Sequence, residues 1–298
     1  MLTTENFSLL AVLIPIHFCA VFVLFPSILS HASIVPLLKD KDFFSRLRMA
    51  NTCCSTYVNT TLAFLSLWIV YNDEETIKDP VNGSSPISRF SLILSLSFLA
   101  YDILILALPL IRHHFFPDYS AEEMAKMDKS LQYLVDDRIQ PKSVTPLKVL
   151  LCKEWDNKSP KERYSFLGHH LTAFLSFWWI LSNDQLLYLA NHRLIAELST
   201  PFLNLMVLAD NIPSVPVLFI DILKISFSIV FISCRMLTAP FFWGTVISVD
   251  LGDVPFWPRI LQTLAPALLD VLNIYWAQKI IYKLIRALKR VESSVGYD

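Results

Sequence analysis

Two adjacent histidines, His169 and His170, lie inside an apolar stretch of this 298-residue sequence and offer imidazole groups for proton transfer. Glu197 and Asp102 also fall within apolar stretches. A charged side chain at such a position is costly unless it has a partner or faces a cavity. Because a base in an active site is commonly oriented by a nearby carboxylate, these four residues are the candidates for catalysis.

Helical spacing selects one histidine as the base. His169, Thr172 and Ser176 are spaced as i, i+3 and i+7, which places them on one face of a helix. His170 lies about 100° around that helix and is expected to orient a substrate or pack against a neighbour. The same spacing marks polar faces on later stretches and adds further candidates for substrate binding: Thr200, Asn204, Arg235, Asp270 and Asn273.

Seven long apolar stretches predict an all-α membrane protein. Hydrophobic residues make up 54% of the chain and charged residues 17%. Each stretch is about long enough to cross a hydrocarbon core of ~30 Å. Only the first lacks an acidic or basic face, so we expect one peripheral helix, with His17 toward the bundle or the interface, and a six-helix bundle with a polar interior. The approximate spans are 7–29, 52–71, 88–111, 166–182, 186–209, 215–243 and 257–283.

The charges of the connecting segments predict the orientation. Segments 30–51 and 112–165 and the C-terminal tail are rich in Lys and Arg, whereas 72–87 is acidic and 244–256 carries no base. The positive-inside rule therefore predicts a lumenal N-terminus and a cytosolic C-terminus. The sequon Asn82-Gly83-Ser84 falls on the lumenal side, so Asn82 is the predicted glycosylation site. For the long cytosolic segment the sequence leaves two alternatives open: a short surface helix that starts near Ser120, or a solvated tether.

Pro201 predicts a break in the fifth span. Proline has no N–H, so the carbonyl of Glu197 should lose its partner in the helix. A membrane helix tolerates such a loss where another group satisfies the acceptor, which indicates a cavity.

Several motifs taken together resemble the TLC-domain superfamily, which includes ceramide synthases. The resemblance covers about residues 42–290 and implies that Tyr101 takes part in substrate binding beside Asp102. The chain lacks the further Asn, Arg, His and Asp elements of the ceramide-synthase branch, so it is similar to the non-synthase members. We divide the chain into an N-terminal anchor, 1–41, the TLC-like domain, 42–290, and a short cytosolic tail, 291–298. The motifs are Arg48-Met49-Ala50-Asn51-Thr52, Tyr101-Asp102, Gly168-His169-His170-Leu171-Thr172, Glu197-Leu198-Ser199-Thr200-Pro201-Phe202-Leu203-Asn204 and the segment ending in Arg235.

The resemblance implies control of membrane lipid composition, in the endoplasmic reticulum or, as the alternative, the plasma membrane. One hypothesis is acyl transfer from acyl-CoA, a co-substrate, to a lipid hydroxyl or amine, with His169 as base. The other is a non-enzymatic sensor that binds an acyl chain or sterol. Membrane lipids are the expected partners, no bound cofactor is expected, and homo- or hetero-oligomerisation stays open.

Other classes fit the sequence less well. Acidic and basic residues nearly cancel, at 26 against 25, so no net charge indicates nucleic-acid binding. The seven histidines show no i, i+3 or i, i+4 spacing of the kind that membrane di-iron sites need, so no metal site is predicted. A seven-helix receptor is disfavoured because the third and seventh spans lack the motifs that end those helices in receptors.

Overall fold

The computed structural model describes residues 4–20, 43–115, 160–210, 212 and 215–295, and within these ranges all regular secondary structure is helical. The all-α prediction is therefore confirmed. The region near Ser120, where a surface helix was considered, lies outside the described residues. At the C-terminus the last helix continues to Val295, so the first part of the predicted tail is helical.

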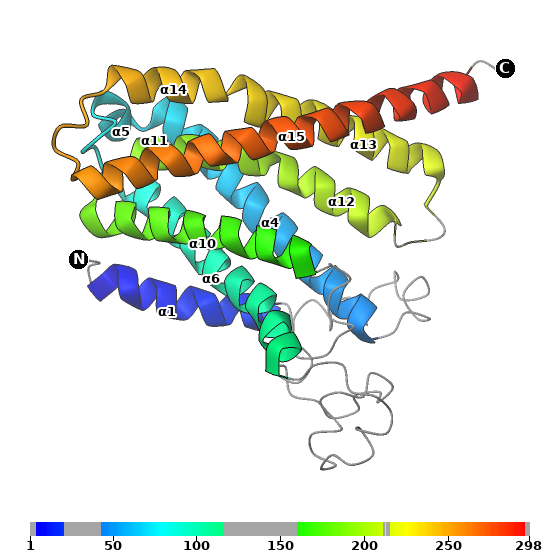
Figure 1. Ribbon diagram of the computed structural model, residues 1–298, viewed down its shortest axis with the longest axis horizontal. Helices are drawn as coiled ribbons and strands as arrows, with labels where there is room; N and C mark the ends of the chain where they lie inside the picture. The colour runs from blue at the N-terminus through cyan, green and yellow to red at the C-terminus, as the bar shows by residue number, and fades with distance from the viewer. Residues whose placement is uncertain (1–3, 21–42, 116–159, 211, 213–214, 296–298) are drawn as a thin grey trace, which may run out of the picture.

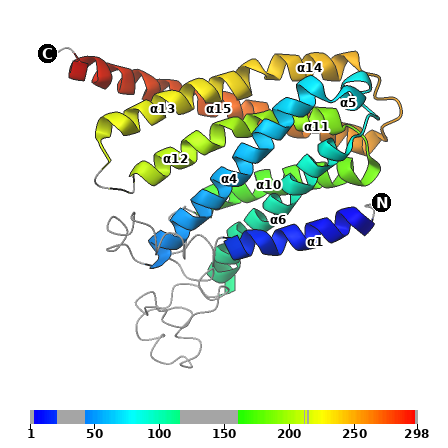
Figure 2. The same cartoon turned by 180° about the vertical axis from the view of Figure 1, so that it is seen from behind.

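The long helices pack side by side, with successive segments running in opposite directions (Figures 1 and 2). Helix α1 (Thr4–Cys19) lies at one edge of the bundle against α6 (Pro86–Phe115). Helix α6 also contacts α4 (Phe43–Asn72) and α10 (Pro160–Asn183). The short helix α5 (Glu74–Lys78) marks one end of the bundle, which we call the α5 end. The C-terminus lies at the opposite end.

Four helical stretches are long and apolar enough to cross a membrane: 49–72, 86–107, 217–248 and 256–286. The count of seven crossings stays a prediction. Helix α10 carries polar residues along its length, and the predicted fifth span is divided into shorter helices. Among the four, the stretch in α6 is the most buried, at 56%, and the stretch in α15 (Phe256–Val295) is the least buried, at 11%. Helix α6 is therefore central and α15 peripheral.

The predicted fifth and sixth spans are both interrupted helices. The fifth consists of α11 (Leu187–Leu194), the 3₁₀ segment η3 (Ile195–Ser199) and α12 (Thr200–Asp210). The sixth consists of α13 (Val217–Phe231), the π-helical segment η4 (Ile232–Leu237) and α14 (Ala239–Ser248). The two irregular segments η3 and η4 pack against each other.

The break near Pro201 has the predicted place but not the predicted consequence. The backbone N–H of Thr200 donates to the carbonyl of Glu197, which closes a 3₁₀ turn. This bond replaces the one that Pro201 cannot make. The expectation of a free backbone acceptor at Glu197 was therefore wrong, because tightening the helix satisfies the group locally.

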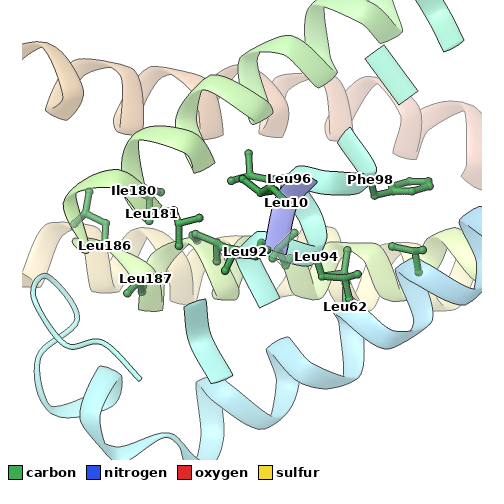
Figure 3. Close-up of a cluster of buried hydrophobic side chains, with 14 of the residues drawn as sticks. Leu10, Leu62, Leu92, Leu94, Leu96, Phe98, Ile180, Leu181, Leu186 and Leu187 are labelled. Carbon is green, nitrogen blue, oxygen red and sulfur yellow. The ribbon is translucent and has the colours of Figure 1, made fainter. Parts of the chain in front are cut away.

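The apolar core lies between α4, α6, α10 and α11, with one residue from α1 (Figure 3). Leu62, Leu92, Leu96 and Leu187 are at most 2% exposed. Helix α1 adds Leu10, and its His17 side chain lies 3.0 Å from the hydroxyl of Ser97. His17 thus faces the bundle, which was one of the two alternatives that the sequence left open.

A polar cluster closes the α5 end of the bundle. Arg89 contacts Asp184 and donates to the hydroxyl of Ser84 at 2.8 Å, and that hydroxyl donates to Asp184 at 2.7 Å. A Cβ atom at Gly83 would collide with the backbone oxygens of Glu75 and Asp79, so only glycine fits there. The result is a tight turn on which Asn82 is exposed.

Exposure of Asn82 makes the predicted orientation testable. We expect wild-type protein from eukaryotic cells to show a band that peptide-N-glycosidase shifts, and we expect Asn82→Gln to abolish that shift, because an exposed sequon on the lumenal side is accessible to the transferase. Immunoblotting of the two proteins measures this. The control is Asn157→Gln, in the predicted cytosolic segment, which should leave the shift intact. A glycan that depends on Asn157 would contradict the orientation.

Candidate functional site

A pocket of about 80 Å³ lies between α10, α11, α14 and α15. Three of the predicted site residues line it from α10: His169, Thr172 and Ser176. Their common helical face, inferred from spacing, is therefore the face that α10 turns to the pocket. A buried water needs roughly 10–15 Å³ measured in the same way, so the pocket has room for several ligand atoms.

The pocket wall is mostly apolar. Opposite α10, helix α15 contributes Gln262, whose side-chain amide donates to the backbone carbonyl of Ser176 at 3.1 Å. The hydroxyl of Ser176 is buried and has no hydrogen-bond partner among the described residues. The rest of the wall is mainly hydrocarbon, including Phe177, Ile180, Leu189, Phe242 and Leu269.

The two adjacent histidines face different neighbours. The ring centroids of His169 and His170 are 5.4 Å apart, but His170 turns toward α6, where its Nδ1 lies 3.4 Å from a carboxylate oxygen of Asp102. The carboxylate of Asp102 is therefore next to the histidine outside the pocket lining. Glu197 and Arg235 are near enough to His169 to interact with it electrostatically.

Glu197 and Arg235 belong to a polar cluster around the two irregular segments. The carboxylate of Glu197 accepts a hydrogen bond from the Thr200 hydroxyl at 2.8 Å. Arg235, on η4, donates through Nε to the hydroxyl of Ser199 on η3 at 3.0 Å and through Nη1 to Asn273 on α15 at 3.4 Å. This cluster joins three elements that are far apart in the sequence.

The remaining predicted residues bind other helices. The Tyr101 hydroxyl donates to Asn51 on α4 at 2.6 Å, and the Asn204 amide donates to Ser55 on α4 at 3.0 Å. Neither residue lines the pocket. The structure thus distributes the predicted site residues over the pocket and several contacts between helices, and their roles in catalysis or binding stay predictions.

Sequence reasoning missed Arg193 as a site residue. Arg193 lines the pocket from α11, and its Nη2 pairs with Asp270 on α15 at 2.6 Å. The other carboxylate oxygen of Asp270 accepts from the indole N–H of Trp243 at 2.8 Å. A basic residue within an apolar stretch was the available signal.

The donor set suits hydrogen bonding and proton transfer. Over the ranges that the structure covers, no three His, Cys, Asp or Glu side chains come close enough together to hold a metal ion. His169 offers, at the wall of the pocket, an imidazole nitrogen that can accept a proton. The arrangement can hold an apolar molecule that carries a few polar atoms.

The fold and this pocket define a helical membrane protein with an apolar site inside the bundle. The family profile of the TLC domain matches residues 48–282. The chain therefore belongs to the TLC-domain family, as its motifs predicted.

The curated relatives carry the same domain in their names. TLC domain-containing protein 4-A of Xenopus laevis is 32% identical over 153 residues, which are 47% of this chain and 56% of that protein. TLC domain-containing protein 4-B of Danio rerio is 25% identical over 260 residues, 84% of this chain and 78% of the relative. Human TLC domain-containing protein 4 is 27% identical over 135 residues, which are 42% of this chain and 50% of the human protein. The matches thus span about half of the length of the frog and human proteins, and no solved structure matches the chain significantly.

The pair of Arg193 and Asp270 gives a stability test. The two side chains are only 11% and 17% exposed, so Asp270→Ala should leave an uncompensated buried cation and cost about 3–5 kcal/mol of the free energy of unfolding. Titration of the purified protein with SDS in mixed micelles measures this loss.

The double variant Arg193→Met/Asp270→Asn is the control for the charge effect. It removes both charges and retains a side-chain oxygen that can accept from Trp243. We expect it to recover most of the lost stability, since replacing both members of a buried ion pair is often nearly neutral. If the double variant were no more stable than Asp270→Ala, the charge pair would not be the cause.

Proposed function

We propose that this protein controls the composition of membrane lipids by binding one lipid in the pocket, with His169 acting as the base in acyl transfer. The observation that carries the proposal is the position of His169: an imidazole at the wall of an otherwise apolar pocket inside a membrane bundle. Membrane helices rarely keep a titratable group facing a cavity without a use for it.

The proposed reaction moves an acyl group from a thioester, acyl-CoA, to a lipid hydroxyl or amine. His169 accepts the proton of that hydroxyl or amine as its oxygen or nitrogen bonds to the acyl carbonyl carbon. The carbon–sulfur bond then breaks, and the departing thiolate takes the proton back from the imidazolium. One ester or amide bond forms, one thioester bond is lost, and the histidine ends neutral.

A second candidate, lipid binding without turnover, is favoured by a different observation. Among the described residues no carboxylate lies within ion-pair distance of His169, whereas His170 has Asp102 at 3.4 Å. The carboxylate of Glu197 instead accepts a hydrogen bond from Thr200. A histidine without an orienting carboxylate is a weaker general base. This arrangement therefore suits a sensor that binds acyl chains or sterols without turnover.

His169→Gln separates the two candidates. Glutamine retains hydrogen bonding but cannot take up a proton, so acyl transfer should fall by about 10²-fold or more. The measurement is transfer from labelled acyl-CoA to lipid acceptors by purified protein in nanodiscs, with lipid analysis of cells that express each variant.

The matched control is His17→Gln, because His17 is a buried histidine on α1 outside the pocket. The acyl-transfer activity of His17→Gln should equal that of the wild type. Transfer that survives His169→Gln would contradict the role of His169. If no transfer is found, and His169→Gln keeps both the bound lipid and the cellular lipid profile of the wild type, the sensor is the correct candidate.

A further inference from the structure

Only part of the hydrogen-bonding capacity of Arg193 is used. Its Nη2 binds Asp270 at 2.6 Å, and its Cζ lies over the ring of Phe242, 4.8 Å from the ring centroid. Among the described residues neither Nε nor Nη1 has a hydrogen-bond partner, and Nε is fully buried. Nη1 is the unpartnered donor that keeps accessible surface, so this residue has an N–H group that a ligand in the pocket can satisfy.

The charge of Arg193 is already balanced. Asp270 supplies one negative charge and is itself held by the indole of Trp243, so the group formed by Arg193, Asp270 and Trp243 has no net charge. A free carboxylate or phosphate at this position would bring a second anion next to Asp270 in an apolar wall, which is unfavourable. What remains available is hydrogen-bond donation without net charge.

A second residue of the pocket also has a polar group without a partner. Ser176 is 5% exposed and lines the pocket from α10, and its buried hydroxyl has no partner among the described residues. The Ser176 hydroxyl has almost no accessible surface, so the donor that a ligand can reach is Nη1 of Arg193. An unmet donor at the wall of an apolar pocket suits a molecule that is mostly hydrocarbon and carries an oxygen acceptor. Water would satisfy the donors but not cover the apolar walls.

We propose that Arg193 is a lipid-binding residue that donates a hydrogen bond to the uncharged carbonyl oxygen of an ester or amide in the bound lipid. The hydrocarbon chain of that lipid covers the apolar walls contributed by α10 and α15. The inference rests on the proposed lipid pocket and adds the recognised chemical group: an acyl carbonyl, as distinct from a free acid or an ether.

The test compares lipids that differ only at the carbonyl. Full-length protein purified in detergent is incubated with 1,2-dioleoylglycerol, a diester, or with 1,2-dioleylglycerol, the diether without carbonyls, and bound lipid is counted by native mass spectrometry. We expect the diester to bind about tenfold more tightly, the effect of one hydrogen bond from a charged donor. An N-oleoyl amide lipid in a third arm distinguishes an amide from an ester as the source of the carbonyl, and oleic acid in a fourth tests the free acid.

Two variants assign the preference to Arg193. Arg193→Lys keeps the cation beside Asp270 but removes the guanidinium donors. Arg193→Met/Asp270→Asn removes both charges and serves if the lysine variant does not fold. Both should bind the diester and the diether within about twofold of each other. Arg89→Lys is the matched control at an arginine–aspartate pair outside the pocket, and it should keep the tenfold preference.

The outcomes are distinct. If the wild type binds the diester and the diether equally, the inference is overturned. It is also overturned if the preference for the diester survives in both Arg193 variants. Neither result contradicts the proposed lipid pocket. Tighter binding of oleic acid than of the diester also overturns the inference. If the wild type binds none of the lipids, the proposed function itself fails.

Discussion

Polar groups placed in hydrocarbon must find their partners within the protein, and the rest of this structure depends on that constraint. The partners lie on helices far apart in the sequence: His170 with Asp102, Arg193 with Asp270, and Asn191 with Ser91 at 2.7 Å. Each pair joins two helices, so the polar residues determine which helices become neighbours. Apolar packing alone is less selective, because leucine side chains fit almost equally well against lipid tails.

The same constraint acts on the backbone. Pro201 removes one helical hydrogen bond, and the chain responds by forming η3, in which the carbonyl of Glu197 is satisfied three residues later. The neighbouring sixth span contains wider turns than an α-helix, where η3 contains tighter ones, and forms the π-helical segment η4. Arg235 on η4 then reaches Ser199 on η3. The two irregular segments therefore complement each other, and π-helical segments are frequent at functional sites.

The sequence predicts the all-helical fold, the polar face of α10 and the break before Pro201, because these follow from apolar length, helical spacing and the missing N–H of proline. It does not predict which carboxylate faces which histidine. Asp102 and Glu197 have similar surroundings in the sequence, and only the rotation of α6 brings Asp102 to His170. The sequence does not predict the place of Arg193 at the pocket, because its partner Asp270 lies 77 residues away on α15. Pairings of this kind depend on tertiary packing, which helical spacing does not encode.

The place of the pocket in the bundle fits the proposed binding of a lipid. The centre is occupied by buried leucines such as Leu92 and Leu96 (Figure 3). The pocket lies instead beside α15, the least buried of the candidate spans, whose Leu264 and Leu268 are 56% and 63% exposed. A lipid that enters next to α15 passes from one hydrocarbon environment to another and does not open the core. In the proposed complex the free energy of binding would come mainly from the few polar contacts inside the pocket, since an acyl chain that leaves the bilayer for the pocket gains little from burial.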